Sequence, residues 1–335
     1  MSGGGDKKRQ MPPANAPVAR QMELFTNFYG DDDYSNTAAL WDSIPRHSVN
    51  PRRQASMRDE NGRLPAYEHH FRFNKTLWRM EVLPAHVRDK DGVRRDYYPS
   101  ADEELVEEVL RRFFADSRMG VHDVEDTQSW VRFTLNMVRR ELKERGRTRS
   151  IAEIKRSLDI MSLASVRLYE GDSEHPAYTT SIISDVVRVT RQQYLEDGKC
   201  MWAARLPALI SKSVNDLAYR QFNYRVLMSL DAQFARWLHK RLSDRFTYAG
   251  IGKTHELSFR SMQRDSGLLT ANRDAKNLAV VEDALDALKA ADVLSIWKKE
   301  ERRGTRRQLE DVIYTLHASM HFVTEQRQAN ARMRA

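Results

Sequence analysis

The chain has 335 residues, 41% of them hydrophobic and 30% charged, with a formal net charge of +8 and a pI near 9.5. This size allows two or three domains with apolar cores, and the positive charge favours a polyanionic partner. The lone Cys200 excludes an internal disulfide and a zinc site built on paired thiols, and it fits a reducing cytoplasm. Because no apolar run of about 18 residues is present, we expect no membrane span and no membrane partner.

Residues 1–65 are predicted to be a disordered tail, because Gly and Pro residues punctuate a stretch without apolar periodicity. An apolar cluster within it contains Gln21, Met22, Leu24 and Phe25. Such a cluster in a polar tail is typical of a linear motif that docks in a pocket of another protein. It resembles the Gln-Leu-x-Leu-Phe peptide with which many bacterial replication proteins bind the sliding clamp, and Met22 replaces the usual leucine. The alternative is a chance cluster.

Residues 66–206 are predicted to form a first domain with a helix-turn-helix. Its expected elements are paired strands at 67–82, a hairpin at 87–98, a helix at 100–114, a strand at 130–133, helices at 135–145 and 150–161, and wing strands at 165–169, 179–189 and 199–206. The second helix of the pair has a basic lip, formed by Arg147, Arg149, Lys155 and Arg156. This lip either contacts DNA or lies solvated beside a dimer interface, and the sequence favours neither.

Residues 207–317 are predicted to form a second domain on the same plan, with a first helix at 229–245. A short apolar segment at 257–259, a brief helix that reaches residues 267–268 and a turn are expected to follow. The segment 270–272 offers an N-cap, with Thr270 at its start, to a long helix from Arg273 to Ala291. Arg273, Lys276 and Asn277 lie in the first turn of this helix, and these residue types reach phosphates and base edges when a helix N-terminus enters a major groove.

A predicted hairpin follows this helix, with strands at 293–297 and 311–316 and a basic loop between them. The loop carries six basic and two acidic residues, a net charge of +4, which suits a wing lying along a phosphate backbone. Its cations are Lys298, Lys299, Arg302, Arg303, Arg306 and Arg307. Residues 318–335 are expected to be a basic C-terminal tail, either as a helix packed on the domain or as a frayed one.

These elements predict an α+β, helix-rich chain with two tandem winged-helix domains and a disordered N-terminal tail. This order resembles the plasmid replication initiators of the TrfA type and the wider Rep family. The resemblance covers about residues 67–316 and rests on three segments, 131–135, 149–169 and 224–242. Trp237 and His239 depart from the family pattern in the last of them.

The resemblance implies a cytoplasmic bacterial protein that binds repeated origin sites, called iterons, in double-stranded DNA. It also implies recruitment of host replication proteins, namely the sliding clamp, the host initiator and the replicative helicase, and a homodimer that acts in repression or copy control. We expect a DNA-binding protein and not an enzyme. The alternative is a winged-helix transcriptional regulator or partition protein without an initiator role.

Two catalytic alternatives are disfavoured by spacing, so we expect no cofactor and no bound metal. A rolling-circle enzyme needs a chelating histidine pair, whereas His69 and His70 are adjacent and would point to opposite faces of a strand. A nucleotide-binding loop ending at Gly252-Lys253-Thr254 would need a glycine at position 247, which is Thr247.

Overall fold

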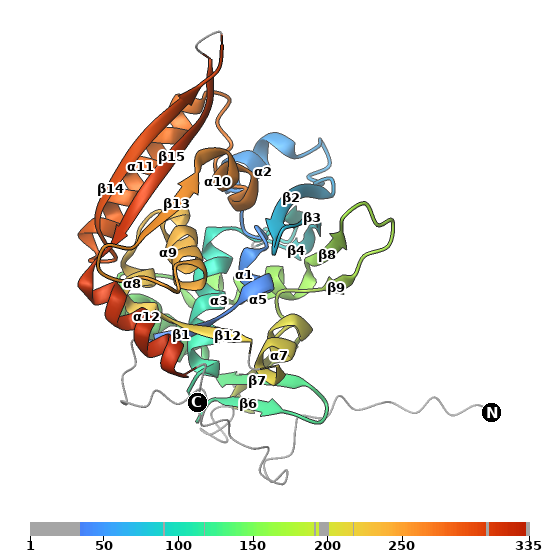
Figure 1. Cartoon of the computed structure of the whole chain (residues 1–335). Helices are drawn as coiled ribbons and strands as arrows, with labels where there is room; N and C mark the ends of the chain where they lie inside the picture. Colours follow the sequence, from blue (N-terminus) through green and yellow to red (C-terminus); the bar gives the residue numbers. More distant parts are fainter. Residues whose placement is uncertain are drawn as a thin grey trace, which may run out of the picture.

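The computed structural model describes residues 34–332, except 90, 117, 191, 194–200, 217, 306 and 307. Two large hydrophobic cores organise this part of the chain. The first is built from residues between Ala38 and Met228, and the second from residues between Leu230 and Val323 (Figure 1). Both cores combine helices and strands, which agrees with the predicted α+β class at this coarse level.

The first core contains most of the described strands. Its helices are α1 (Ala39–Ser43), α2 (Pro51–Met57), α3 (Ala101–Phe114), α4 (Leu135–Glu144), α5 (Ile151–Leu163), α7 (Ala208–Asn215) and α8 (Tyr224–Ser229). Its strands are β1 (Tyr34–Ala38), β2 (Tyr67–Phe73), β3 (Thr76–Leu83), β4 (Ala85–Arg88), β5 (Arg94–Tyr97), β6 (Gly120–Asp123), β7 (Gln128–Phe133), β8 (Ser165–Glu170), β9 (Tyr178–Thr180), β10 (Asp185–Val187), β11 (Trp202–Arg205) and β12 (Tyr219–Asn223). Helix α3 packs against β7, α4 and α5.

The segment 34–65, predicted to be part of a disordered tail, is folded. Strand β1 pairs antiparallel with β12, with Thr37 opposite Arg220, and Trp41 of α1 is fully buried. The Trp41 indole N–H donates to Glu107 Oε1 at 2.8 Å. The prediction was wrong here because β1 and α1 are too short for a periodic signal, and the partner of β1 lies far along the chain. Residues 1–33, which include Gln21 to Phe25, lie outside the described residues.

The boundary between the cores lies near residue 229, whereas the sequence analysis predicted a domain boundary at residue 206. Helix α7 packs against β7 and β1, and β12 completes the sheet that β1 begins. Tyr224, Leu227 and Met228 of α8 are fully buried in the first core. A local apolar pattern can indicate that a segment is buried, but it does not say which core receives the segment.

The helix-turn-helix predicted in the first domain is present as α4 and α5, but the strands around it do not form one wing. Strand β8 joins the sheet β2-β3-β8-β9, whereas β10 and β11 join β7 in the sheet β10-β11-β7-β6. The tandem winged-helix arrangement therefore stays a prediction for this half of the chain. Alternating apolar residues indicate a strand, but they do not determine which strand it pairs with.

The second core follows the predicted order of helix, turn, helix and hairpin. Its elements are α9 (Gln233–Arg245), β13 (Thr254–Ser258), α10 (Phe259–Ser266), α11 (Asp274–Ala290), β14 (Leu294–Arg303), β15 (Leu309–Ala318) and α12 (Met320–Arg332). The strands form one antiparallel sheet in the order β13-β15-β14. Residues 320–332, predicted to be a tail, are helical, and Phe322 and Val323 are buried in the core. Within the described residues, no helix has the length and apolar character needed to span a membrane.

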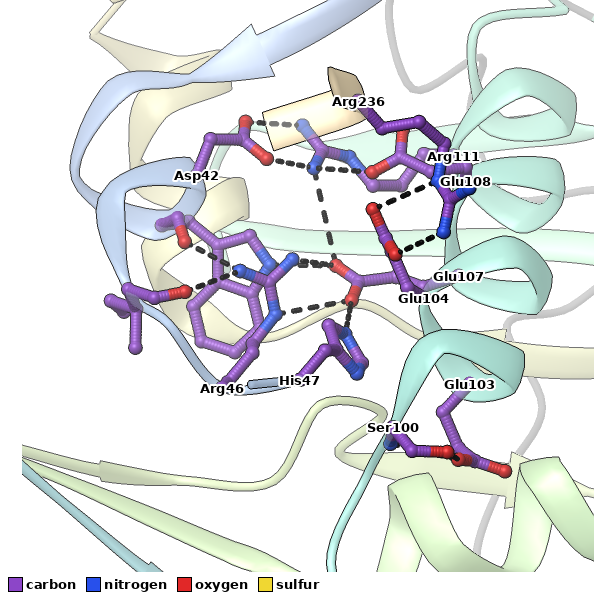
Figure 2. Close-up of polar contacts among 12 residues, drawn as sticks. Asp42, Arg46, His47, Ser100, Glu103, Glu104, Glu107, Glu108, Arg111 and Arg236 are labelled. Carbon is purple, nitrogen blue, oxygen red and sulfur yellow. Dashed lines mark hydrogen bonds and ion pairs between the residues drawn. The ribbon is translucent and has the colours of Figure 1, made fainter. Parts of the chain in front are cut away.

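The two cores meet across a cluster of buried charged side chains, which we call the inter-core network (Figure 2). Arg236 of α9 pairs with Glu104 of α3 at 2.8 Å. Lys240, also on α9, pairs with Glu108 at 2.6 Å and with Asp42. Burial alone would raise the pKa of Asp42, but Arg111 and Lys240 hold that pKa well below its usual value. Separating the cores, or removing one partner of a buried ion pair, would leave the other charge buried without a partner, which is energetically costly. The network therefore favours this relative position of the two cores.

Candidate nucleic-acid interface

Helix α10 and the turn after it set the direction in which α11 starts. The Ser258 hydroxyl caps α10 by accepting from the Ser261 N–H at 3.2 Å. The helix ends at Gly267, whose φ of +64° lies in the left-handed region that glycine adopts without strain. In the turn that follows, Leu269 is buried in the second core, with 3% of its own surface exposed. The chain therefore enters α11 from an anchored loop.

Asn277 holds this turn closed and is not available to DNA. Its side chain is buried, its Nδ2 donates to the Ala271 carbonyl at 2.8 Å, and its Oδ1 accepts from the Ala271 N–H at 3.0 Å. The prediction that Asn277 contacts bases is therefore wrong. Asn is a donor-rich residue type in either role, and its place on the buried face of α11 decides between them.

Arg273 and Lys276 are both exposed at the start of α11. The N-cap residue is Arg273, and no side chain caps the helix there, so the predicted cap at 270–272 is wrong. Thr270 is also exposed. In the part of the chain that the structure describes, neither Arg273 nor Lys276 takes part in an ion pair, so both cations remain available to an anionic ligand.

The hairpin β14–β15, called the wing below, is longer than predicted. Each strand has ten residues, so the basic segment expected as a loop is mostly strand. Figure 1 shows the wing as a long ribbon with α11 beside it. Polar contacts join them: Lys299 pairs with Glu282 at 2.7 Å, the Tyr314 hydroxyl donates to Glu282 at 3.3 Å, and the Trp297 indole N–H donates to Asp286 at 2.9 Å. The local pattern missed this extension because charged strand residues resemble a polar loop.

The cations of the wing lie on two faces, because side chains alternate along a strand. Lys299 and Arg303 share the face with Trp297, and their charges are matched by Glu282 and Glu301. Lys298 and Arg302 lie on the opposite face and are exposed. Neither has an ion pair with any described residue. Arg306 and Arg307 lie outside the described residues.

Arg260 ties the start of α11 to the wing. Its guanidinium pairs with Asp274 at 2.6 Å and also donates to the carbonyls of Glu310 and Leu309, at 3.0 and 3.4 Å. The hydrogen bond to Asp274 raises the pKa of Arg260, so the guanidinium keeps its charge. One side chain thus spans α10, α11 and β15. Sequence reasoning missed Arg260, because a lone arginine on a short helix carries no signal for such a role.

The basic lip of the first domain is largely engaged within the protein. Arg147 pairs with Asp231 at 2.7 Å and donates to the Leu230 carbonyl, so it joins the first core to the start of the second. Arg149 pairs with Asp102, and Arg156 pairs with Asp89 at 3.1 Å. Lys155 is exposed. A role of this lip in DNA contact therefore stays a prediction, carried best by Lys155.

Comparison with known proteins gives structural neighbours of low identity. No family model and no curated protein matches the sequence. Domains 2 and 3 of RctB are similar at 10% identity, over 84% of this chain and 98% of that chain, with a TM-score of 0.49. The Pi initiator protein, in a complex with iteron DNA, is similar at 9% identity, over 71% of this chain and 98% of that chain, with a TM-score of 0.42. An initiator protein is thus among the neighbours, and the function of this chain has to be argued from its own residues.

Proposed function

We propose that this chain binds double-stranded DNA sequence-specifically through the second core and initiates replication of a plasmid or related element at repeated origin sites. The N-terminus of α11 supplies base and phosphate contacts through Arg273 and Lys276, and the wing lies along the backbone. Base contacts carry the specificity, and phosphate contacts supply most of the affinity.

The observation that carries this proposal is the position of Arg260. Its contacts with Asp274, Leu309 and Glu310 hold the start of α11 beside the outer part of the wing. Exposed cations on both elements can then meet one duplex at the same time. A helix N-terminus in a major groove with a wing on the adjacent backbone is a docking geometry that such an arrangement permits.

The replication role is supported by the sequence resemblance and by the peptide Gln21 to Phe25. On this proposal the peptide tethers the protein to the sliding clamp, and the host initiator, the replicative helicase and a second copy of the chain are further partners. The protein acts by binding and not by catalysis.

The binding part is tested by selecting duplexes from a random library with the full-length chain and measuring affinity for the enriched site. Arg273→Ala should cost about 1–3 kcal/mol if it makes a bidentate base contact. Lys289→Ala is the matched control, because Lys289 is exposed on the last turn of the same helix. Equal affinity of the Arg273, Lys276 and Lys289 variants would overturn the assignment of α11.

The replication part is tested by supplying the gene in trans to a plasmid that carries only an origin fragment with the selected sites. Stable maintenance of that plasmid supports the initiator role. Specific binding without maintenance would instead favour the transcriptional regulator or partition protein.

A further inference from the structure

The exposed face of α11 changes character within its first two turns. Arg273 and Lys276 come first, followed by the exposed residues Ala279 and Val280. The side chain of Val280 is 40% exposed, whereas its neighbour Val281 is fully buried in the second core. An apolar patch therefore lies next to two cations on the surface that the proposed function turns toward DNA.

Val280 is not among the residues that build the second core or that pack against it. A β-branched residue loses side-chain freedom in a helix, so alanine, which occupies positions 275, 279 and 284 of the same helix, would stabilise α11 more. At an exposed position the packing of valine offsets little of that loss. An apolar contact with a ligand would compensate for that loss.

The charge of α11 marks where such a contact ends. Glu282, Asp283 and Asp286 follow Val280, and carboxylates are repelled by phosphate. Glu282 and Asp286 are also engaged by Lys299 and Trp297 of the wing. We therefore expect DNA contact along α11 only from Arg273 to Val280, and Val280 is the C-terminal residue of that segment.

We propose that Val280 reads the 5-methyl group of thymine in the major groove. This inference rests on the proposed function and adds the base type that the helix selects. The thymine methyl is the apolar group that the major groove presents, and apolar side chains recognise it by contact. The seven residue steps from Arg273 to Val280 span about 10 Å along a helix axis, which corresponds to about three base pairs of DNA. The recognised site should therefore contain a thymine about three base pairs from the base contacted by Arg273.

The test replaces each thymine of the enriched site, one at a time, by deoxyuridine, which lacks only the methyl group. At one position the wild-type chain should lose about four-fold in affinity, the value expected for one methyl group removed from an apolar contact. Arg273→Ala should relax specificity about three base pairs away from that position. In Val280→Ala, deoxyuridine and thymine at that position should bind equally well.

Val124→Ala is the control, because Val124 is 47% exposed and lies in the turn between β6 and β7, outside the second core and the wing. It should retain the sensitivity to deoxyuridine. Uniform tolerance of deoxyuridine by the wild-type chain, or a Val280→Ala variant that keeps the wild-type sensitivity, would overturn the thymine assignment while leaving specific binding intact. Failure of the library to yield any enriched site would instead overturn the proposed function, on which the assignment depends.

Discussion

Arg236 of α9 donates two hydrogen bonds to the carboxylate of Glu104 on α3, at 2.8 and 3.3 Å, and so joins the second core to the first. The Arg236 side chain is only 2% exposed. It also donates to the carbonyls of Leu230 and Asp231, at 3.0 and 2.9 Å, which fixes the start of the second core.

Arg236→Ala should therefore destabilise the protein strongly, because it leaves the largely buried Glu104 carboxylate and the Asp231 carbonyl without this donor. The Leu230 carbonyl keeps the hydrogen bond from Arg147. We expect a loss of about 3–5 kcal/mol in the free energy of unfolding, measured by urea denaturation. Glu104→Gln keeps a hydrogen-bond acceptor and should lose less. A loss below about 1 kcal/mol for Arg236→Ala would show that the pair does not hold the cores together.

His239 should make the fold sensitive to acid. It is fully buried, and neither ring nitrogen has a hydrogen-bond partner among the described residues. Burial, with a smaller contribution from Lys240, lowers its pKa from 6.5 to about 3. The folded state binds this proton more weakly than the unfolded state does. The free energy of unfolding is therefore unaffected by His239 above about pH 6.5, and it decreases as the pH falls from there toward 3.

The His239 contribution should amount to about 2 kcal/mol by pH 5, from the difference between the two pKa values. His239→Leu removes the titrating group and fills a similar volume. The difference in unfolding free energy between pH 7.5 and pH 5 should shrink by that amount in this variant, as measured by urea denaturation at both values. An identical pH dependence in the two proteins would contradict the assignment.

Gly267 should tolerate no side chain. A Cβ built there would lie 3.0 Å from the Cβ of Ser48 and 3.2 Å from the Cβ of Pro45, in the first core. Gly267→Ala therefore adds a clash between cores to the left-handed backbone cost of about 1–2 kcal/mol. Gly146→Ala is the control, since its φ is +75° and a Cβ there meets nothing within 4 Å. Thermal denaturation should show the larger loss for Gly267→Ala, and equal losses would mean that the contact with Pro45 and Ser48 yields freely.

The two faces of the wing should differ in their contribution to DNA binding. Joint neutralisation of Lys298 and Arg302 should flatten the slope of log affinity against log salt by about 1.8, or about 0.9 for each lost phosphate contact. Neutralising Lys299 and Arg303 should change the slope less, because Glu282 and Glu301 already match their charges. Titrations of the selected duplex at several salt concentrations measure both slopes. If the first pair leaves the slope unchanged, that face of the wing does not contact phosphate.

The peptide at Gln21 to Phe25 makes a separate prediction. Replacing Leu24 and Phe25 by alanine should abolish binding to the sliding clamp, because apolar anchors carry most of the energy of a short docking motif. DNA affinity and melting temperature should not change. Met22→Leu, which restores the usual motif, should keep clamp binding. A lower melting temperature with unchanged clamp affinity would instead mean that Leu24 and Phe25 belong to a folded core.

Helices could be predicted from the sequence where one element carries its own pattern. The stripe Val281, Leu285 and Leu288 indicates the buried face of α11, and all three side chains are fully buried. Pairing between distant segments could not be predicted in this way. The partner of β1 and the sheet that receives β8 depend on long-range packing, which leaves no local periodicity.

In the candidate site, too, features set by local sequence could be predicted, and features set by long-range packing could not. Exposed cations such as Arg273 and Lys276 follow from residue type and position near a helix N-terminus. The hydrogen bonds of Asn277 to Ala271 and the link made by Arg260 depend on which neighbours the fold brings close. The inter-core network is hidden for a further reason: its charged residues have the composition of a solvated surface, although Glu107, Glu108 and Arg111 are buried.

The pairing of β1 with β12 constrains the order in which the chain acquires its structure during synthesis. Thr37 leaves the ribosome well before its strand partner Arg220, which is 183 residues later. The first core therefore cannot close until β12 has been translated, and closing so long a loop slows folding. The second core, drawn from one contiguous stretch, assembles from nearby segments as they emerge. An early stop before Tyr219 would leave β1 as an unpaired edge, open to pairing with other nascent chains.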